Sequence, residues 1–377
     1  MENHTGTPAA APGTPDMGAL LGVIRSLVGE VHPHWKNLHF TPETQLEREL
    51  GLDSMARLEL RTRIEATLGV RLDETMAIAA ATPNDLLCAL VLHTADGQAC
   101  TGPADTVQGD ASELLMGTFG TAGSAAAGKQ GHSPGEWLYA AYAWSVFSVL
   151  GMLAWLLVVL APFEHWRRKL AHLCARLFFR ATFTPLQVTG HEHLDPSRPQ
   201  IIVANHASYL DGFIVTAALD MPIHFIVKGE LASRPAVRIL LQRFGVEFVD
   251  RFNARKGASD VRRIAEKSRN GQSIVFFPEG TFTSFAGLQP FRMGAFVTAA
   301  RSNVPVVPVA IRGARDIVRG SHWFPYRGRI HVTICPPVWP QGTGWEVALN
   351  LRNAARRAIV PYIGEPDLVE GENGETG

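Results

Sequence analysis

Hydrophobic residues follow three different patterns along the chain, and each pattern predicts a different structure. In the N-terminal part they recur every four residues, on one face of an expected helix. In the middle, no charged residue occurs from Trp137 to Phe163. In the C-terminal half, short apolar runs have the length of buried strands. We therefore expect a multidomain chain: an all-α domain, an apolar anchor and an α/β domain, in that order.

The N-terminal pattern predicts a small helical domain over residues 17–92. A first helix is expected near Met17 to Glu30. The last helix is opened by Thr82 to Asp85, with a threonine cap, proline at the first helical position and an acid at the third. Another helix begins at Ser54. Its apolar residues repeat every four positions: Ala56, Leu60, Ile64 and Leu68.

The uncharged stretch is long enough to cross a membrane. Ser133 to Glu136 combine a serine cap, a proline and an acid, which predicts the start of a helix. The roughly 26 apolar and small residues that follow can span a hydrocarbon core of about 30 Å, and a soluble core helix explains this length less well. A second helix, over His165 to Phe183, has leucines opposite arginines, as helices in a membrane interface do.

A histidine and an aspartate follow the first apolar run of the C-terminal half. Ile201 to Ala204 is interpreted as a buried strand and Ser208 to Ala218 as a helix, so His206 lies at the turn between them. Asp211 is placed to contact one imidazole nitrogen, which leaves the other to take a proton from a substrate hydroxyl. This is the His–Asp half of a Ser-His-Asp triad, with an incoming alcohol in place of the serine. A histidine that only caps the turn is the alternative, and the other motifs decide between the two.

Three further motifs follow apolar strands. Ser273 to Phe277 is interpreted as a buried strand that ends in Pro278-Glu279-Gly280-Thr281. Between the two segments, Lys228 and Arg251 each follow an apolar strand. Four strand-end motifs in this order resemble the glycerolipid acyltransferase family, typified by lysophosphatidic acid acyltransferases. The resemblance covers roughly residues 186–361.

This resemblance implies a role for each motif. His206 is the general base and Asp211 its orienting partner. Glu279, Gly280 and Thr281 shape the acceptor site. Lys228 and Arg251 bind a phosphate or similar anion. Arg292 occupies the basic position that usually follows the third motif and also contacts the substrate. Many family members carry arginine directly after Glu-Gly-Thr, where this chain has Phe282. Lysophosphatidate is therefore the default acceptor, and another lysophospholipid, an amino-acid lipid or another membrane alcohol or amine stays open.

The N-terminal segment Glu49-Leu-Gly-Leu-Asp-Ser-Met55, with the helices around it, resembles an acyl carrier protein. The resemblance implies a four-helix domain with 4′-phosphopantetheine attached to Ser54 and with Asp53 as its characteristic neighbour. A phosphodiester there lies beside the positive end of a helix dipole. It also implies a phosphopantetheinyl transferase and an acyl-loading enzyme as partners. The alternative is that Ser54 only caps its helix.

Carrier and acyltransferase must share one side of the membrane, because attachment and loading of the prosthetic group are expected in the cytoplasm. A single complete crossing would separate them. We therefore predict that the apolar helix turns back near Pro162 and that residues 133–184 form a re-entrant or monotopic anchor in the cytoplasmic (inner) membrane. The acyltransferase domain is expected over residues 185–364.

The remaining segments are predicted to be unstructured. Residues 93–132 are rich in Gly, Ala, Ser and Thr and form a flexible linker of roughly 35 Å end-to-end distance. Residues 1–16 and 365–377 are expected to be disordered tails.

Composition restricts the function further. The chain has 35 basic and 35 acidic residues, a balance that does not favour nucleic-acid binding. Its four cysteines have neither metal-ligand spacing nor a disulfide pattern, and no metal is expected. The sequence thus predicts a membrane-associated O-acyltransferase that moves a fatty acyl group from a thioester to a lyso-lipid hydroxyl. The donor is the fused carrier, a separate carrier or acyl-CoA. The alternative is a membrane-tethered carrier or scaffold whose second domain only binds lipid.

Overall fold

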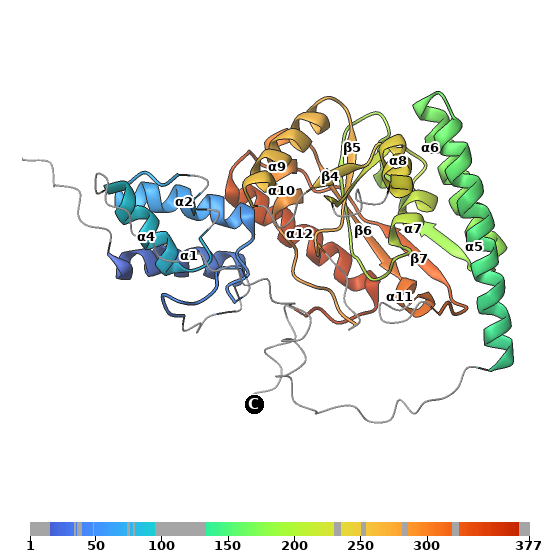
Figure 1. Cartoon of the computed structure of the whole chain (residues 1–377), viewed down its shortest axis with the longest axis horizontal. Helices are drawn as coiled ribbons and strands as arrows, with labels where there is room; N and C mark the ends of the chain where they lie inside the picture. The colour runs from blue at the N-terminus through green and yellow to red at the C-terminus, as the bar shows by residue number, and fades with distance from the viewer. Residues whose placement is uncertain are drawn as a thin grey trace, which may run out of the picture.

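The computed structural model places a helical domain on one side of an α/β domain and a long helical hairpin on the other (Figure 1). It describes residues 16–33, 35, 40–47, 49–73, 76–77, 80–94, 133–229, 235–249, 254–280, 286–318 and 324–368. The predicted linker from residue 95 onward and the N-terminal tail up to residue 15 lie outside these ranges. A helical N-terminal part and a C-terminal α/β domain are present, as predicted.

The N-terminal domain contains α1 (Met17–Val31), α2 (Ser54–Leu68) and α4 (Pro83–Thr94). Its core is formed by the apolar faces that the four-residue repeat predicts, since Leu60 and Ile64 of α2 are at most 1% exposed. α4 begins at the predicted cap: the Thr82 hydroxyl accepts the backbone N–H of Asp85, and the Asp85 carboxylate accepts that of Thr82. Three of the expected four helices are thus described as α-helices here.

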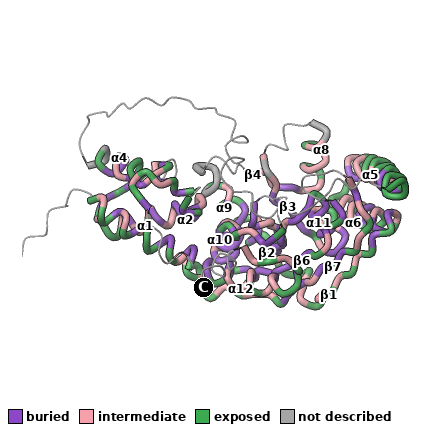
Figure 2. Tube along the Cα trace, turned by 90° about the horizontal axis from the view of Figure 1, so that it is seen from below, coloured by how far each residue is buried: buried purple, intermediate pink, exposed green. Residues whose placement is uncertain are grey.

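The apolar segment forms α5 (Pro134–Leu160), and α6 (Glu164–Ala181) packs back along it. Ser133 and Glu136 cap the start of α5 reciprocally, as the sequence predicts. Among the described residues, one helix is long and apolar enough to cross a membrane, and this helix is α5. Most of its surface is exposed (Figure 2). The chain reverses between Leu160 and Glu164, so the two helices form a hairpin.

In the described part of the chain, seven strands form one sheet with the order β1-β7-β6-β2-β5-β3-β4, and the β6–β7 pair is the one antiparallel pair of neighbouring strands in it. The strands are β1 (Leu186–Thr189), β2 (Ile201–Ala204), β3 (Ile223–Lys228), β4 (Glu247–Val249), β5 (Ser273–Phe276), β6 (Val306–Arg312) and β7 (Ile330–Ile334). The helices of this domain are α7 (Asp211–Ala218), α8 (Pro235–Phe244), α9 (Ala254–Arg269), α10 (Gly294–Ser302), α11 (Ala314–Ile317) and α12 (Trp345–Ile363), with a short η2 (His191–His193).

Both faces of the sheet are covered, because alternate residues of its strands enter different apolar clusters. Ile201 and Val203 of β2 belong to a cluster with α9, α10 and α12. Ile202 and Ala204 belong to another with α6 and α7. Burial on both faces explains why the strands appear in the sequence as continuous apolar runs.

Two of the differences between predicted and observed boundaries have a clear cause in hydrogen bonding. α7 begins at Asp211 rather than Ser208, because the Asp211 carboxylate accepts the backbone N–H groups of Ala207 and Ser208 and so holds those residues in a turn. The predicted C-terminal tail starts too early. Glu365 accepts hydrogen bonds from Arg315 and from the backbone of Gly287, and the described residues continue to 368.

Candidate functional site

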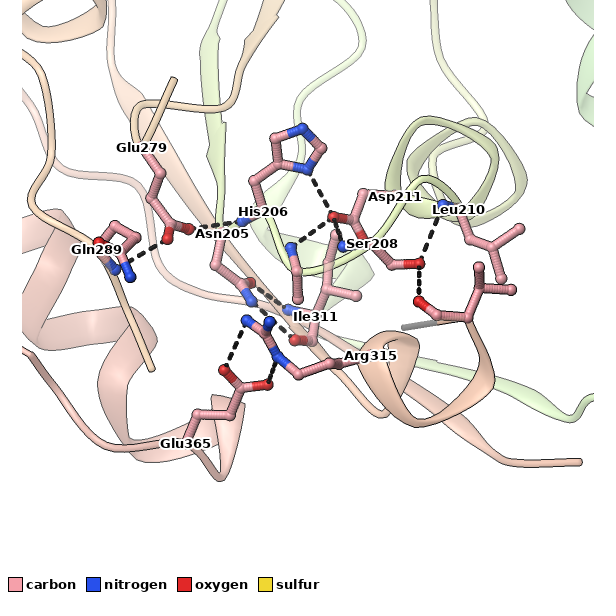
Figure 3. A network of polar contacts seen from close by, with 12 residues as sticks. Asn205, His206, Ser208, Leu210, Asp211, Glu279, Gln289, Ile311, Arg315 and Glu365 are labelled. Carbon is pink, nitrogen blue, oxygen red and sulfur yellow. Dashed lines mark hydrogen bonds and ion pairs between the residues drawn. The ribbon is translucent and has the colours of Figure 1, made fainter. Parts of the chain in front are cut away.

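His206 and Glu279 lie at the same edge of the sheet. His206 follows β2 by two residues, and Glu279 follows β5 by three. These strands are parallel neighbours, so their carboxyl ends meet at one edge, where open α/β sheets usually bind ligands. The two side chains are drawn together in Figure 3.

The imidazole of His206 is held by Asp211. Nδ1 of His206 lies 2.7 Å from Oδ2 of Asp211, and the same oxygen accepts the N–H groups of Ala207 at 2.7 Å and Ser208 at 2.8 Å. Because a carboxylate only accepts, Nδ1 carries the hydrogen, and Nε2 of the neutral ring has the lone pair. The arrangement can therefore take a proton at Nε2.

The Asp211 carboxylate is buried, but the His206 ring beside it remains accessible. Asp211 is completely buried, whereas 21% of the His206 side chain is exposed. Phe277 stacks on the imidazole with 4.6 Å between ring centroids. The other carboxylate oxygen of Asp211 is buried and has no hydrogen-bond partner among the described residues, which costs stability and is unusual for a purely structural carboxylate. A reactant can thus reach the ring, while the carboxylate stays protected from water.

Glu279 fixes the backbone around the pair. One of its carboxylate oxygens accepts the N–H of His206 at 2.6 Å, and the other accepts that of Gln289 at 2.9 Å (Figure 3). The following Gly280 has a φ of 81°, which favours glycine. Burial raises the pKa of Glu279 to about 7, against the lowering effect of the two N–H groups. Glu279 therefore ties β2 to the loop that precedes α10.

We expect Glu279 to make stability depend on pH. Its pKa is raised from 4.5 to about 7 on folding, so the stability that its burial permits is complete below pH 4.5 and is lost as pH rises through 7. The free energy of unfolding of wild type relative to Glu279→Gln should therefore fall by about 2.5 kcal/mol between pH 5 and pH 8, which denaturant titration measures. The exposed Glu346→Gln serves as control, and a constant difference would refute the assignment.

Two neighbours of the pair secure the turn, and the sequence interpretation gave them no role. The Asn205 side chain donates to the carbonyl of Ile311 at 2.9 Å and accepts its N–H at 2.7 Å, which joins β2 to β6. The Ser208 hydroxyl donates to the carbonyl of Val318 at 3.0 Å. Both residues are buried. The sequence did contain a signal for both residues. Asn205 directly precedes His206 and Ser208 follows it by two positions, and both are polar residues just after an apolar strand.

The predicted cations are only partly placed. Lys228 ends β3, but its side chain, like Arg251 and Thr281, lies outside what the structure describes. Arg292 is exposed, and its guanidinium lies 3.8 Å from the carboxylate of Glu47 in the N-terminal domain. His206, Asp211, Glu279 and Gly280 are thus brought together.

Ser54 occupies the first position of α2 but does not cap it. Asp53 does so: its Oδ1 accepts the N–H groups of Met55 at 3.0 Å and Ala56 at 2.9 Å. Ser54 is half-buried. Because the aspartate performs the capping, the serine hydroxyl is not needed for it, and a phosphodiester fits beside the helix N-terminus.

Comparison with known proteins agrees with both halves of this description. Residues 22–90 match the family described as phosphopantetheine attachment site, and residues 185–312 match the family described as acyltransferase. Over 216 residues the chain is 30% identical to the lyso-ornithine lipid O-acyltransferase of Pseudomonas aeruginosa, an alignment that covers 50% of this chain and 76% of that protein. The chain belongs to the acyltransferase family. Both resemblances that the sequence suggested are confirmed.

Other members of the acyltransferase family are similar over the same region. The chain is 33% identical over 182 residues to the chloroplastic 1-acyl-sn-glycerol-3-phosphate acyltransferase BAT2 of Brassica napus, which covers 47% of this chain and 53% of that protein. It thus spans about half the length of this relative. The crystal structure of the 1-acyl-sn-glycerophosphate acyltransferase PlsC from Thermotoga maritima shares the fold, with a TM-score of 0.50 and 24% identity over 59% of this chain and 95% of that one.

Proposed function

We propose that the protein transfers a fatty acyl group from a thioester to the hydroxyl of a lyso-lipid. The observation that carries the proposal is the 2.7 Å contact between His206 and Asp211 at the carboxyl edge of the sheet. Nε2 of His206 takes the hydroxyl proton as the acceptor oxygen attacks the thioester carbonyl. The new C–O bond forms, the C–S bond breaks, and the proton passes to the leaving sulfur. Asp211 stabilises the imidazolium that exists between the two proton transfers.

The acceptor is a lyso-lipid whose head group the relatives leave open. One relative is named for lyso-ornithine lipid and others for 1-acyl-sn-glycerol-3-phosphate. Purified protein incubated with labelled acyl-CoA and each of these two lyso-lipids tests the choice. Because lysophosphatidate is the default acceptor, we expect labelled phosphatidate as the main product. Preferred labelling of the ornithine lipid would overturn that assignment. Labelling of neither lyso-lipid, with acyl-CoA as donor and with an acyl group loaded on Ser54 as donor, would overturn the proposed function.

We further propose that α5 and α6 lie in the membrane interface rather than across the bilayer. Near the start of α5, Trp137 lies edge-on against Phe324 of the acyltransferase domain with 5.2 Å between ring centroids, and Arg327 of the same domain lies over the ring of Tyr139. At the other end, the guanidinium of Arg167 of α6 donates to the backbone carbonyl of Arg243 of α8, and α5 packs on α8. A helix attached to the domain at both ends lies along its surface and leaves both domains on one side. Its large exposed apolar residues are Trp137, Leu138, Tyr142, Trp144, Val149, Met152, Leu153, Leu156 and Leu160.

The same apolar surface continues towards the candidate site. Phe147 of α5 contacts Phe213 of α7 at 6.0 Å between ring centroids, and Phe213 is 45% exposed. Tyr209, three residues after His206, is 47% exposed. A lyso-lipid that lies in the membrane interface therefore has an apolar path towards His206.

Replacing Leu153 and Leu156 together by aspartate should release the protein from lipid vesicles. Each substitution removes an exposed apolar side chain and adds a charge, whose burial among acyl chains costs roughly 2.5–3.5 kcal/mol at the bilayer centre and less near the interface. We expect the vesicle-bound fraction in flotation to fall at least tenfold, whereas Tyr362→Asp, on the exposed surface of α12, binds like wild type. Undiminished binding of the double variant would rule out this membrane face.

A further inference from the structure

The carrier domain is seated on the acyltransferase domain through α2. This helix lies against α9, close to α10 and α12 (Figure 1). Met55, in its first turn, is 4% exposed and belongs to the apolar cluster of the acyltransferase domain rather than to the carrier's own core. Leu58 packs against the same cluster, and Trp345 of α12 packs against the cores of both domains. We call this contact, formed by Asp53, Met55 and Leu58 with α9, α12 and the start of α10, the docking face.

Polar contacts make the docking face specific. Oδ2 of Asp53 accepts the backbone N–H of Met293 at 2.7 Å, while the other oxygen of Asp53 caps α2. Arg352 of α12 is 7% exposed and donates to the carbonyl of Val31, at the end of α1, at 2.9 Å. Burial lowers the pKa of Arg352 to about 10. Burial, together with the positive charge of Arg352, lowers the pKa of His32, the residue after Val31, to about 4. A buried guanidinium is costly without partners, so its bond to the carrier indicates a matched surface.

The docking face lies at the same edge of the sheet as His206. α10 connects the parallel strands β5 and β6, so it starts where β5 ends. The backbone N–H of Arg292, next to Met293, donates to the carbonyl of Pro278 at 2.9 Å. Pro278 precedes Glu279, which accepts the N–H of His206. A short series of direct contacts thus connects the residue beside Ser54 to the backbone of His206.

We propose that the docking face is the position from which the carrier presents an acyl group bound through Ser54 to His206, so that the donor is the chain's own carrier. Asp53 is the positioning residue, because it holds α2 and the start of α10 together while Ser54 stays available. The inference rests on the proposed acyl transfer and names its donor. It also explains why Met55 is apolar and buried although the carrier's core does not use it.

Variants on each side of the docking face test the inference. Met55→Glu places a charge in the apolar contact and leaves the carrier core intact. Trp345→Ala removes part of the contact from the acyltransferase side and changes no residue of the carrier. Ala19→Glu adds the same charge at an exposed position of α1 and serves as control. The mass of each protein after treatment with a phosphopantetheinyl transferase confirms loading, with Ser54→Ala as the unmodified reference.

Two readouts are compared: hydrogen exchange of the Met293 amide, and single-turnover transfer from acyl-loaded Ser54 against transfer from acyl-CoA. We expect both docking variants to exchange Met293 faster and to slow transfer from Ser54 at least tenfold, with acyl-CoA transfer unchanged and Ala19→Glu like wild type.

Several results would overturn the inference. These are an unprotected Met293 amide in wild type, undiminished transfer from Ser54 in the docking variants, or an equal slowing with both donors. If the wild-type protein transfers acyl groups from acyl-CoA but not from its own acyl-loaded Ser54, only the docking inference is contradicted. Wild type that uses neither donor contradicts the proposed function as well.

Discussion

Replacing His206 by alanine should lower acyl transfer by roughly a thousandfold, within the range that removal of a positioned general base produces. The expected loss is large because nothing else that the structure describes at this edge of the sheet combines a nitrogen lone pair with a buried orienting carboxylate. The initial rate of labelled ester formation at saturating donor and acceptor measures the loss. Vesicle binding should remain at the wild-type level, because the membrane face that we propose is formed by α5 and α6.

His191→Ala is the matched control for this substitution. His191 is exposed in η2 of the same domain, so its loss should leave the rate unchanged. A His206→Ala protein that folds, binds vesicles and transfers acyl groups within a few-fold of wild type would remove the base from the mechanism.

Asp211→Asn should lower transfer by about a hundredfold or more, although the side chain keeps its shape. In wild type one oxygen of Asp211 accepts three N–H groups, from the His206 ring and from the backbone of Ala207 and Ser208. Asparagine can keep an oxygen there but loses the charge that stabilises the imidazolium, and its amide group can favour the wrong tautomer of the ring. The rate constant of a single turnover isolates this effect from binding.

Asp220→Asn provides the comparison, since Asp220 is exposed just beyond the end of α7. We expect it to behave as wild type. Equal rates for Asp211→Asn and wild type would mean that Asp211 only shapes the turn, which its two backbone hydrogen bonds would explain without any role in proton transfer.

The contact between His206 and Asp211 could be predicted because both residues lie in one short segment. A strand followed by a helix leaves few conformations for the six residues between them, and β2 has the predicted bounds Ile201–Ala204. Glu279 was predicted to follow another buried strand and, by the family resemblance, to shape the acceptor site. Its contact with the backbone of His206 was not predicted, because that depends on β2 and β5 being neighbours.

The docking face could not be predicted either, because it also depends on which segments, far apart in the sequence, lie side by side in the fold. Asp53 and Met293 are separated by most of the chain, and their bond joins a side chain to a backbone amide, which no residue type reveals. Met55 looked like one more apolar residue beside Ser54, and nothing in its spacing indicates that it enters a cluster of the second domain. Arg292 was predicted to contact substrate on its motif position, and its neighbour in the structure is Glu47.

The mass of the product formed from an isotopically labelled acyl thioester and a lyso-lipid with one free hydroxyl tests the central claim most directly. We expect purified wild-type protein to place one labelled acyl group on that hydroxyl as an ester, and His206→Ala to form almost none. Free fatty acid as the sole labelled product, or the same amount of ester from His206→Ala, would contradict the account.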